Sequence, residues 1–420
     1  MTCDLTARFP AGASLTLSDL EDDPHPHLAR LREHEPVSWL PALGGWLVTS
    51  RDLALRVMRD AAAFTVDDPR FSTAQVVGPS MLSLDGPAHT RHRDPFARPF
   101  RPARTRERFT AFVEAEAGRL AGGLAPAGRA ELRGELAGPL AVAVVTEALG
   151  LYGVDAATVR SWYGAFVEAV SAITAGGTAP AGADEAYRLL GAAVEEAIGA
   201  ARPGSLLAEA AHGAAAPDTG PLDTGPLDTG PLDTGPLDTG PLDTGPLDTG
   251  PLDTGPLDTG PLDTGPLDTV EVVANAAILM FGGIDTTEGM IANLALHLLG
   301  EPAQLRLVLD DRDLLPAAIE ESLRLEPAAS VVDRYATRDA DLGGTRVRAG
   351  DLVRVSIAGA NRDPAAFPDP DRFDVRRENA AEHLAFAHGP HFCFGSHLAR
   401  LEARTALTAL LDRLPGLRLD

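Results

Sequence analysis

The sequence predicts a mainly α-helical domain with small β-sheets, an α+β fold. Three observations carry this prediction. Residues 104–200 form long segments of helical spacing rich in Ala, Leu, Glu and Arg. Residues 270–299 follow one apolar helical pattern, and strand-forming residues gather in short groups at 36–50 and 331–357. A hydrophobic content of 45% is sufficient for a substantial core.

The first half of the chain contains a short sheet and then a helical body. Val and Trp residues flank Gly44-Gly45 within 36–50, which predicts two strands joined by a turn. The helical body at 104–200 should be broken where Gly and Pro cluster, because these residues end helices. Such clusters lie near Ala125, Gly150 and Gly176.

The second half begins with the apolar segment Val270 to Leu299, which is far longer than a usual helix and should therefore cross the core. The elements expected after it are a helix at 316–325, strands at 331–335 and 347–357, an irregular Pro/Asp-rich stretch at 361–377, and a last helix at 396–414.

An internal repeat separates the two halves. Nine complete copies of Pro-Leu-Asp-Thr-Gly run from Pro221 to Gly265, with partial copies on both sides. Pro in every copy removes a backbone donor and Gly adds chain entropy, which favours disorder or loose turns over a helix or a paired strand. A pentapeptide β-solenoid is the alternative. We expect a single domain spanning 1–420, with 217–269 as a disordered insertion in the loop before the long helix.

Charge and cysteine content exclude several classes of protein. The formal charge of −24 opposes binding to nucleic acid, although eleven Asp residues between 218 and 268 account for much of it. Only Cys3 and Cys393 are present, so no disulfide framework is expected. The N-terminal residues lack the pattern of a signal peptide or membrane anchor, and the apolar stretches elsewhere look too short or too interrupted to span a bilayer. We expect a soluble, cytoplasmic monomer.

The segment Phe386 to Gly395 contains the second cysteine in a setting that suits an anionic sulfur. Gly389 and Gly395 permit a tight loop whose backbone N–H groups face the Cys393 sulfur, and the following helix presents its positive N-terminus. A lone thiolate beside the apolar Phe386 is suited to one axial bond on a haem iron. Three alternatives are an ordinary buried thiol, a catalytic nucleophile activated by His, and a zinc site. The zinc ligands would be His388, His391, Cys393 and His397.

Phe386 to Gly395 resembles the haem-binding signature F-x-x-G-x-H-x-C-x-G of the cytochrome P450 family, with Ala387 where Gly is more frequent. Two further segments resemble the family's E-x-x-R and P-x-R-F motifs, namely Glu321 to Arg324 and Pro370 to Phe373. The resemblance implies a structural network of Glu321, Arg324 and Arg372 that pins the loop under the haem. Without the resemblance, Glu321 and Arg324 would be a surface pair.

The long helical segment contains Gly282-Gly-Ile-Asp285-Thr286-Thr287, which resembles the family's oxygen-activation motif. The two glycines would let the helix approach a flat ligand closely. The resemblance implies that Asp285 and Thr286 hydrogen-bond dioxygen and relay protons to it. Read alone, the segment could equally be a helix weakened by Gly and capped by Thr.

Cations for the haem propionates are implied at four positions. His89 and Arg93 share one helical face in an H-x-x-x-R pattern that resembles the family's C helix, and Arg334 and His391 complete the group. A basic surface patch is the alternative for the arginines of this region, which could also dock an acidic ferredoxin. They are Arg91, Arg93, Arg98 and Arg101.

The resemblance implies a P450 monooxygenase with a long central helix over haem b. The haem iron would be bound by Cys393, and the enzyme would activate O2 with electrons from NAD(P)H. External ferredoxin and ferredoxin reductase would supply these electrons, since the chain has no flavin or iron–sulfur segment. The implied cavity walls are 71–82, 278–283 and 328–332, whose small apolar residues suggest a hydrophobic secondary metabolite as substrate. Oxidative coupling or desaturation is a second possibility, and a non-catalytic haem-binding protein a third.

Overall fold

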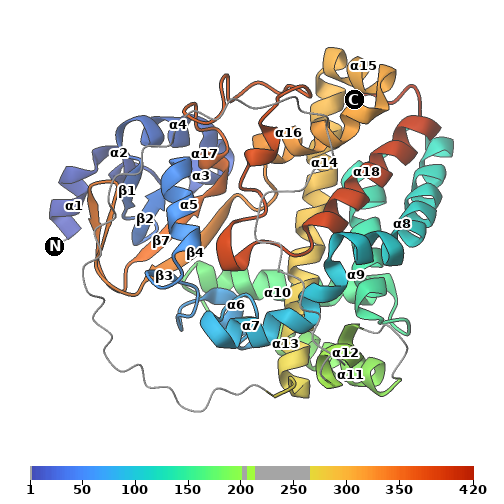
Figure 1. Ribbon diagram of the computed structural model, residues 1–420, viewed down its shortest axis with the longest axis horizontal. Coiled ribbons are helices and arrows are strands. Elements are labelled where there is room, and N and C mark those ends of the chain that lie inside the picture. Colours follow the sequence, from blue (N-terminus) through green and yellow to red (C-terminus); the bar gives the residue numbers. More distant parts are fainter. Residues whose placement is uncertain (1, 201–205, 213–264) are drawn as a thin grey trace, which may run out of the picture.

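Helices account for most of the computed structural model, which describes residues 2–200, 206–212 and 265–420. Figure 1 shows a sheet-containing region with the N-terminus on one side and a helical body with the C-terminus on the other. The predicted mainly α fold with small sheets is therefore confirmed. Apart from residues 265–269, the repeat lies outside the described residues.

The helical body breaks where Gly was expected to break it. Gly150 (φ 72°) follows the end of one helix and Gly176 (φ 81°) follows the end of the next. Positive φ favours Gly because other residues carry a Cβ that clashes there. A π-helical turn at Arg133–Ala137 precedes the first of these helices. The helices of this body are α8 (Pro102–Leu124), α9 (Gly138–Leu149), α10 (Ala156–Thr174), α11 (Gly182–Gly199) and α18 (Ser396–Arg413).

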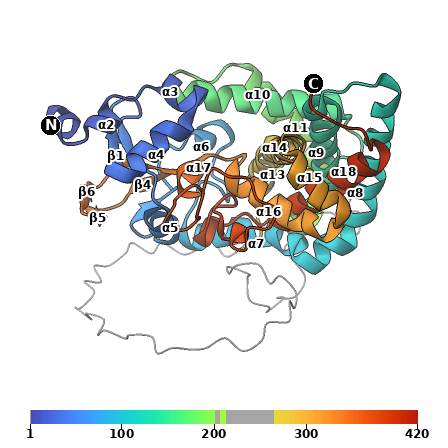
Figure 2. The same ribbon diagram turned by 90° about the horizontal axis from the view of Figure 1, so that it is seen from above.

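The long central segment consists of two helices, α13 (Thr269–Gly283) and α14 (Asp285–Gly300). The predicted extent is confirmed, but the predicted continuity is wrong, because Ile284 adopts φ −90° and ψ −72° between them. A capping box of Asp268 and Glu271 fixes the start of α13. The two helices form one column through the middle of the molecule in Figure 1, which Figure 2 views along its axis.

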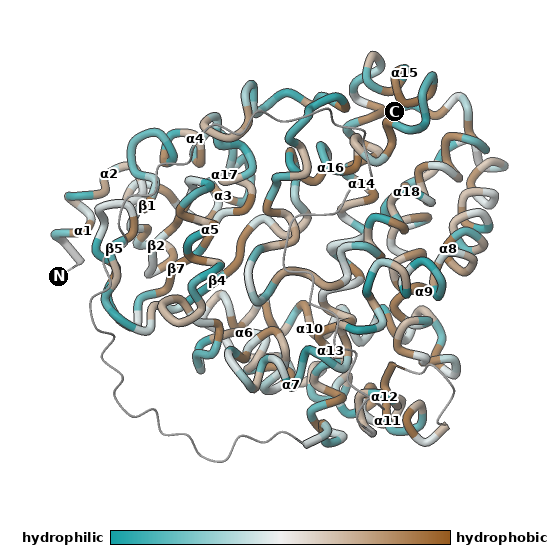
Figure 3. The backbone as a smooth tube through the Cα atoms, in the orientation of Figure 1, coloured by the Kyte–Doolittle hydropathy of each residue, from teal (hydrophilic) through white to brown (hydrophobic). Residues whose placement is uncertain are grey.

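This column corrects the expectation that no apolar stretch could span a bilayer. The run Thr269–Gly300 has 32 residues, and an 18-residue window within it reaches a mean hydropathy of 1.3. Half of that window is buried inside the protein, as is typical of a core helix. Figure 3 shows the contrast between the apolar α13 and the hydrophilic α4 (Pro24–His34) on the outside.

The main sheet has five strands in the order β1-β2-β7-β4-β3. Only the β2–β7 pair is parallel. The strands are β1 (Val37–Leu40), β2 (Gly45–Val48), β3 (Phe64–Thr65), β4 (Val331–Ala336) and β7 (Leu352–Ser356). The two strands predicted within 36–50 are therefore confirmed, as is the strand at 331–335.

The strand predicted at 347–357 is two strands. Its first residue ends β6 (Thr345–Val347), which pairs with β5 (Ala340–Leu342), and the rest forms β7. A turn separates β6 from β7. Gly350 has φ 84° in it, and the Asp351 carboxylate accepts a hydrogen bond from the Arg348 N–H.

Several short helices were not predicted from the sequence, among them all four before β1. Polar residues interrupt their apolar pattern, so their periodicity is weak. The remaining helices of the described chain are α1 (Thr2–Arg8), α2 (Pro10–Ala13), α3 (Leu17–Asp22), α4, α5 (Arg51–Arg59), α6 (Ser72–Val77), α7 (Gly86–Ala97), α12 (Leu206–His212), α15 (Pro302–Asp310), α16 (Leu315–Leu325) and α17 (Ile357–Ala360).

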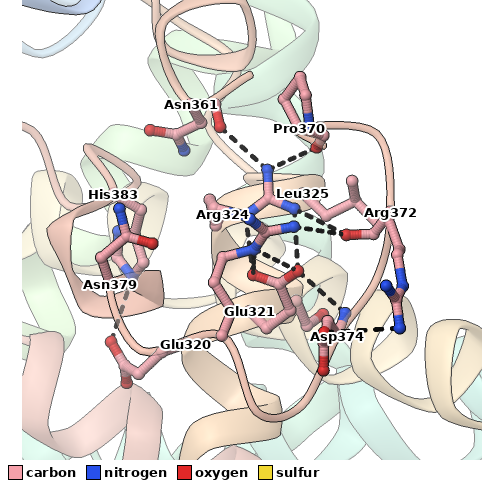
Figure 4. A network of polar contacts seen from close by, with 12 residues as sticks. Glu320, Glu321, Arg324, Leu325, Asn361, Pro370, Arg372, Asp374, Asn379 and His383 are labelled. Atoms are coloured by element: carbon pink, nitrogen blue, oxygen red, sulfur yellow. Dashed lines mark hydrogen bonds and ion pairs between the residues drawn. The ribbon is translucent and has the colours of Figure 1, made fainter. Parts of the chain in front are cut away.

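A buried charge cluster joins α16 to the irregular stretch that follows β7. The side chains of Glu321 and Arg324 are both 0% exposed and form a two-fold ion pair, with N–O distances of 2.7 and 2.9 Å. Arg324 also donates to the carbonyl oxygens of Asn361, Pro370 and Arg372 (Figure 4). All five N–H groups of this guanidinium are thus used, two by Glu321 and three by the irregular stretch, which they hold in place.

The second arginine side chain of the cluster is Arg377. The prediction that the side chain of Arg372 joins Glu321 and Arg324 was wrong. The Arg377 Nε lies 3.0 Å from Glu321 Oε1 and also donates to Oε2. The Arg372 side chain points outward, is 64% exposed and lies 3.6 Å from Asp374. Arg372 enters the cluster only through its carbonyl, because the turn at 369–372 directs its side chain to solvent.

A neighbouring carboxylate connects α16 to α18. Arg400 donates to Glu320 at 2.6 and 2.7 Å, and His383 lies 3.2 Å from the same carboxylate. Burial alone would raise the pKa of Glu320, but the hydrogen bonds from Arg400 and His383 lower it to about 2. The helix after the cysteine loop is thereby fixed to the helix that carries the buried charge cluster.

The loop before α18 contains two residues with positive φ, Ala387 (58°) and Gly389 (73°). A Cβ on Gly389 would lie 2.5 Å from the Met58 carbonyl oxygen, so only glycine fits there. Ala387 carries a Cβ in a conformation that costs non-glycine residues about 1–2 kcal/mol. This position is the one where the family more often has Gly.

We predict that Glu321→Gln lowers the free energy of unfolding by about 3–5 kcal/mol, because two buried guanidinium groups would lose their counter-charge. Urea denaturation of the purified protein measures this loss. Arg372→Gln is the matched control and should change stability by less than about 0.5 kcal/mol, since its side chain is largely in solvent. Equal losses in the two variants would contradict the assignment of Arg377 as the second arginine.

We predict that Ala387→Gly raises stability by about 0.5–1 kcal/mol, because glycine relieves the left-handed backbone at a small entropic cost. Thermal unfolding measures the change. Ala385→Gly serves as control in the same loop. It should destabilise the protein, since positive φ does not occur at that residue. A destabilising Ala387→Gly would show that the loop backbone is not strained.

Candidate functional site

A cavity of about 950 Å³ lies between the α13–α14 column and the cysteine loop. All three wall segments implied by the family resemblance contribute to it, for example through Phe71, Ile278 and Val332. Cys393 and Thr286 line the same cavity. The structure therefore brings together segments that are more than 100 residues apart in the sequence.

The cysteine loop presents its sulfur to this cavity. The Cys393 N–H donates to the Phe386 carbonyl at 2.9 Å, which closes the loop, and Cys393 is exposed where it faces the cavity. Desolvation within the cavity, away from bulk water, raises the pKa of the Cys393 thiol, while the N–H groups of Gly395 and Ser396 at the start of α18 lower it. A cation bound at the sulfur would favour the thiolate further, because metal ligands bind deprotonated.

Aromatic side chains with arginines above them surround the sulfur. Phe386 and Phe394 line the cavity. The Arg400 guanidinium lies 4.4 Å from the centre of the Phe386 ring, and that of Arg93 lies 5.2 Å from the centre of the Phe394 ring. The immediate surroundings of Cys393 are thus apolar, with cations one layer behind.

The zinc alternative finds no support in the described residues, where no group of three His, Cys, Asp or Glu side chains could hold a metal ion. His388 contacts the Arg59 side chain, and His391 Nε2 lies 2.9 Å from Asp85 Oδ1. Each of these histidines therefore has another partner. Cys393 remains as a single sulfur facing a large cavity, which fits one axial bond to a haem iron.

Arg334 is a buried cation whose nearest counter-charges, Asp85 and Asp333, lie beyond salt-bridge distance. It is 4% exposed and forms no salt bridge with any described residue. Its guanidinium donates to the Asp333 carbonyl, and burial lowers its pKa to about 10. Because Arg334 lines the cavity, a bound anion could form the direct ion pair that this guanidinium lacks. Haem propionates are such anions, so this residue fits the cofactor.

The three other predicted cations lie next to the same cavity in different states. His89 Nε2 is buried without a hydrogen-bond partner in the described structure, and burial lowers the pKa of His89 to about 3. The His89 and His391 rings are 4.4 Å apart, but His391 is bound to Asp85. Arg93 is directed at the Phe392 carbonyl of the cysteine loop. His89 and Arg334 are therefore the two with unused hydrogen-bonding or ionic capacity.

The two glycines at the end of α13 have different roles. At Gly282 no atom lies within 4 Å of the place where a Cβ would be, so this backbone faces the open cavity. At Gly283 a Cβ would lie 2.7 Å from Val145 Cγ2 of α9. Gly282 therefore leaves room on the cavity side, which is compatible with the expected approach of a flat ligand, whereas Gly283 allows close packing of two helices.

The structure separates Asp285 from Thr286. Thr286 lines the cavity and donates from Oγ1 to the Gly282 carbonyl, bridging the break between α13 and α14. Asp285 does not line the cavity. Its side chain is 52% exposed and lies 2.8 Å from Arg133. The predicted pair therefore consists of one hydroxyl inside the cavity and one carboxylate on the outside of the same helix.

Sequence reasoning missed the partners of α14 on that outer side. Glu288 is buried between Arg133 at 2.6 Å and Arg160 at 3.0 Å. The arginines come from the π-helical turn and from α10, more than 100 residues upstream, and no local spacing in the sequence connects them to Glu288. It also missed Glu402 of α18, a buried acid that lines the cavity.

Comparisons with known proteins agree with this architecture. The family model described as Cytochrome P450 matches residues 308–415. Cytochrome P450 monooxygenase PikC of Streptomyces venezuelae is 35% identical over 416 residues, covering 96% of this chain and 86% of PikC. Nocardicin C N-oxygenase of Nocardia uniformis subsp. tsuyamanensis is 32% identical and covers 100% and 94% of the two chains.

The fold has a solved counterpart as well. The crystal structure of HmtN, a post-tailoring hydroxylase involved in himastatin biosynthesis, superposes with a TM-score of 0.72 at 26% identity, over 94% of this chain and 89% of HmtN. Relatives more than 30% identical thus extend over nearly the whole length, beyond the part that the family model matches. From its sequence, its fold and its relatives, the chain belongs to the cytochrome P450 family and is a P450 monooxygenase.

Proposed function

We propose that this enzyme binds haem b through Cys393 and uses O2 to hydroxylate, or otherwise oxidise, a hydrophobic small molecule of secondary metabolism. The observation that carries the proposal is the single cysteine sulfur that faces a cavity of about 950 Å³, where the described residues include no group of three or more side chains able to hold a metal ion. The names of the relatives support the metabolic role, since himastatin biosynthesis and nocardicin oxidation are secondary metabolism.

The residues have distinct roles in this proposal. Cys393 would hold the iron, and Arg334, His89 and Arg93 would hold the propionates from the cavity edge. Haem supplies the reductive activation of O2 when it is bound. Thr286 Oγ1 would bind dioxygen by a hydrogen bond and pass a proton to it, replacing the bond that it now donates to the Gly282 carbonyl.

Asp285 would exchange protons with solvent, since its carboxylate is half exposed and paired with Arg133. Rotation of that carboxylate away from Arg133 would bring a proton from the surface to the helix that carries Thr286. We assign it as the outer end of the relay, which is consistent with its location outside the cavity lining.

The electrons would come from NAD(P)H through an external ferredoxin and its reductase. Two of the four arginines considered for docking have partners inside the protein, because Arg91 pairs with Glu271 and Arg93 faces Phe392. Of the other arginines, Arg98 lies in η1 (Arg98–Phe100), which we propose as the basic part of that surface. We place the enzyme in the cytoplasm, where such electron carriers are found, and propose that it is a monomer.

The substrate is proposed as hydrophobic because apolar residues predominate in the lining of the cavity. Its walls include Phe71, Met81, Leu82, Ile278 and Val332. Two of the charged residues of the lining, Asp333 and Arg354, pair with each other at 2.7 and 2.8 Å. Oxidative coupling or desaturation would use the same cavity, and product analysis distinguishes these reactions from hydroxylation.

We predict that reduced wild-type protein treated with carbon monoxide gives the red-shifted absorption band of a thiolate-ligated haem, and that Cys393→Ser abolishes it. Serine is a poor ligand and does not donate the same electron density. Cys3→Ser, which changes the other cysteine, should leave the band intact. An unchanged band in Cys393→Ser would eliminate the proposed ligand, and a colourless wild-type protein would eliminate the proposed function.

We predict that Thr286→Ala uncouples electron use from product formation by a factor of about ten or more, since it removes the hydroxyl that passes protons to oxygen. The measurement is the amount of hydrogen peroxide released per NADH consumed. It is made with a substrate that is first identified by its effect on the spin state of the haem iron. Thr174→Ala is the control. Thr174 also lines the cavity and donates to the carbonyl four residues before it, but from α10. Equal uncoupling in both variants would argue against a relay role.

A further inference from the structure

The loop between α6 and α7 forms part of the cavity wall but has open space on two sides. Its residues Met81 and Leu82 line the main cavity, whereas Pro79 and Leu84 line a second cavity of about 340 Å³. Figure 1 shows α6 and α7 beside α13, which contributes to the lining of both cavities. Because few atoms back the loop on either side, packing alone does not fix its position.

A single polar contact connects this loop to the central column. The Met81 N–H donates to Oδ1 of Asn275 at 2.8 Å, and both groups are buried. Asn275 belongs to α13, is 0% exposed and does not line the main cavity. The other hydrogen bonds of residues 80–83 in the described structure stay within the turn, between Ser80 and Ser83 or from the Leu82 N–H to Ser80. The side chain of Asn275 therefore anchors the turn from behind.

Two further contacts fix the orientation of the Asn275 amide. Its Nδ2 donates to the Glu271 carbonyl at 2.7 Å and to Nδ1 of His92 at 3.0 Å. Burial lowers the pKa of His92, so its ring is neutral at pH 7, and its Nε2 lies 3.3 Å from the Glu271 carboxylate. With Nε2 as the donor to Glu271, Nδ1 is the acceptor for Asn275. A turned amide would place N–H groups against the Met81 N–H, so Oδ1 has only one direction open to it.

An asparagine at this place in α13 is not explained by the helix itself. The neighbouring Ala274, Ala276 and Ala277 are buried and apolar, and Asn is a weaker helix former than Ala or Leu. All hydrogen-bonding groups of the Asn275 amide are used, and the Met81 N–H is the partner that belongs to neither α13 nor α7. The amide thus serves the cavity loop.

We propose that Asn275 is a positioning residue for substrate selection, which holds Met81 and Leu82 in the cavity wall through the Met81 backbone. The proposal rests on the proposed monooxygenase function and deepens it. With the anchor, this wall is preformed, and a bulky hydrophobic molecule binds without having to order it. A molecule too small to reach the wall does not depend on the anchor. Asn275 itself contacts no substrate in this role.

The test is Asn275→Leu in the haem-loaded full chain, with two probes that bind the haem iron and change its absorption spectrum. Imidazole occupies only the space beside the iron, whereas clotrimazole carries three aryl groups that extend to the cavity walls. The dissociation constant of clotrimazole should rise about tenfold, because the freed loop must be ordered on binding. That of imidazole should change by less than about twofold, and the carbon monoxide band should be retained. A general loss of structure would weaken both probes alike.

Two variants of similar size serve as comparisons. Asn275→Asp keeps an oxygen that accepts from the Met81 N–H, so it should bring the clotrimazole constant back to within about threefold of wild type. Asn293→Leu is the matched control, because Asn293 also donates from the central column to a backbone carbonyl, that of Glu326, but does not line the cavity. It should leave the constants of both probes unchanged.

The proposal is overturned if Asn275→Leu binds clotrimazole as wild type does, if both probes weaken equally, or if Asn275→Asp behaves like Asn275→Leu. Should Asn275→Leu lack the carbon monoxide band, His92→Leu decides. This variant removes an acceptor that orients the amide and should weaken clotrimazole alone, by about threefold. Unchanged binding in His92→Leu would then overturn the proposal. A wild-type protein without the carbon monoxide band would instead contradict the proposed function itself.

Discussion

The negative charge of Glu321, held without any exposure to solvent, is the interaction on which the rest of the molecule depends. Two guanidinium groups and a backbone N–H surround it, and the same guanidinium groups bind the carbonyls of the irregular stretch before the cysteine loop. A chain segment without helix or strand has few ways to satisfy its carbonyls, so this cluster replaces secondary structure. The position of the Cys393 sulfur follows from it, since loop and cluster are continuous in the chain.

Sequence patterns predicted the features that depend on local spacing. The helices at 104–200, the strands around Gly44-Gly45 and the cysteine loop are such features, and each lies at the predicted place. Arg377 could not be distinguished from Arg372 in this way. Both follow the same proline-rich turns, and only the path of the backbone through 369–377 determines which side chain turns inward.

Features that depend on distant residues were also beyond local patterns. The position of Asp285 outside the cavity depends on Arg133, which is 152 residues away. The role of Gly283 depends on Val145 of another helix. Whether the buried Glu402 finds a hydrogen-bond partner also depends on residues distant in the sequence, and its Oε2 has none in the described structure. The helical period of the segment 269–300 gave its length but not its interruption, because one residue at Ile284 barely alters the apolar pattern.

At Gly282 the wall of the cavity has space for a larger side chain. A side chain there would extend into open space, whereas at the adjacent Gly283 even one methyl group would collide with α9. Alanine, serine or valine at 282 would therefore reduce the cavity volume available to the substrate in graded steps. The surrounding helices would keep their positions. Selectivity for guest size can thus change at one codon without any repacking of the helices.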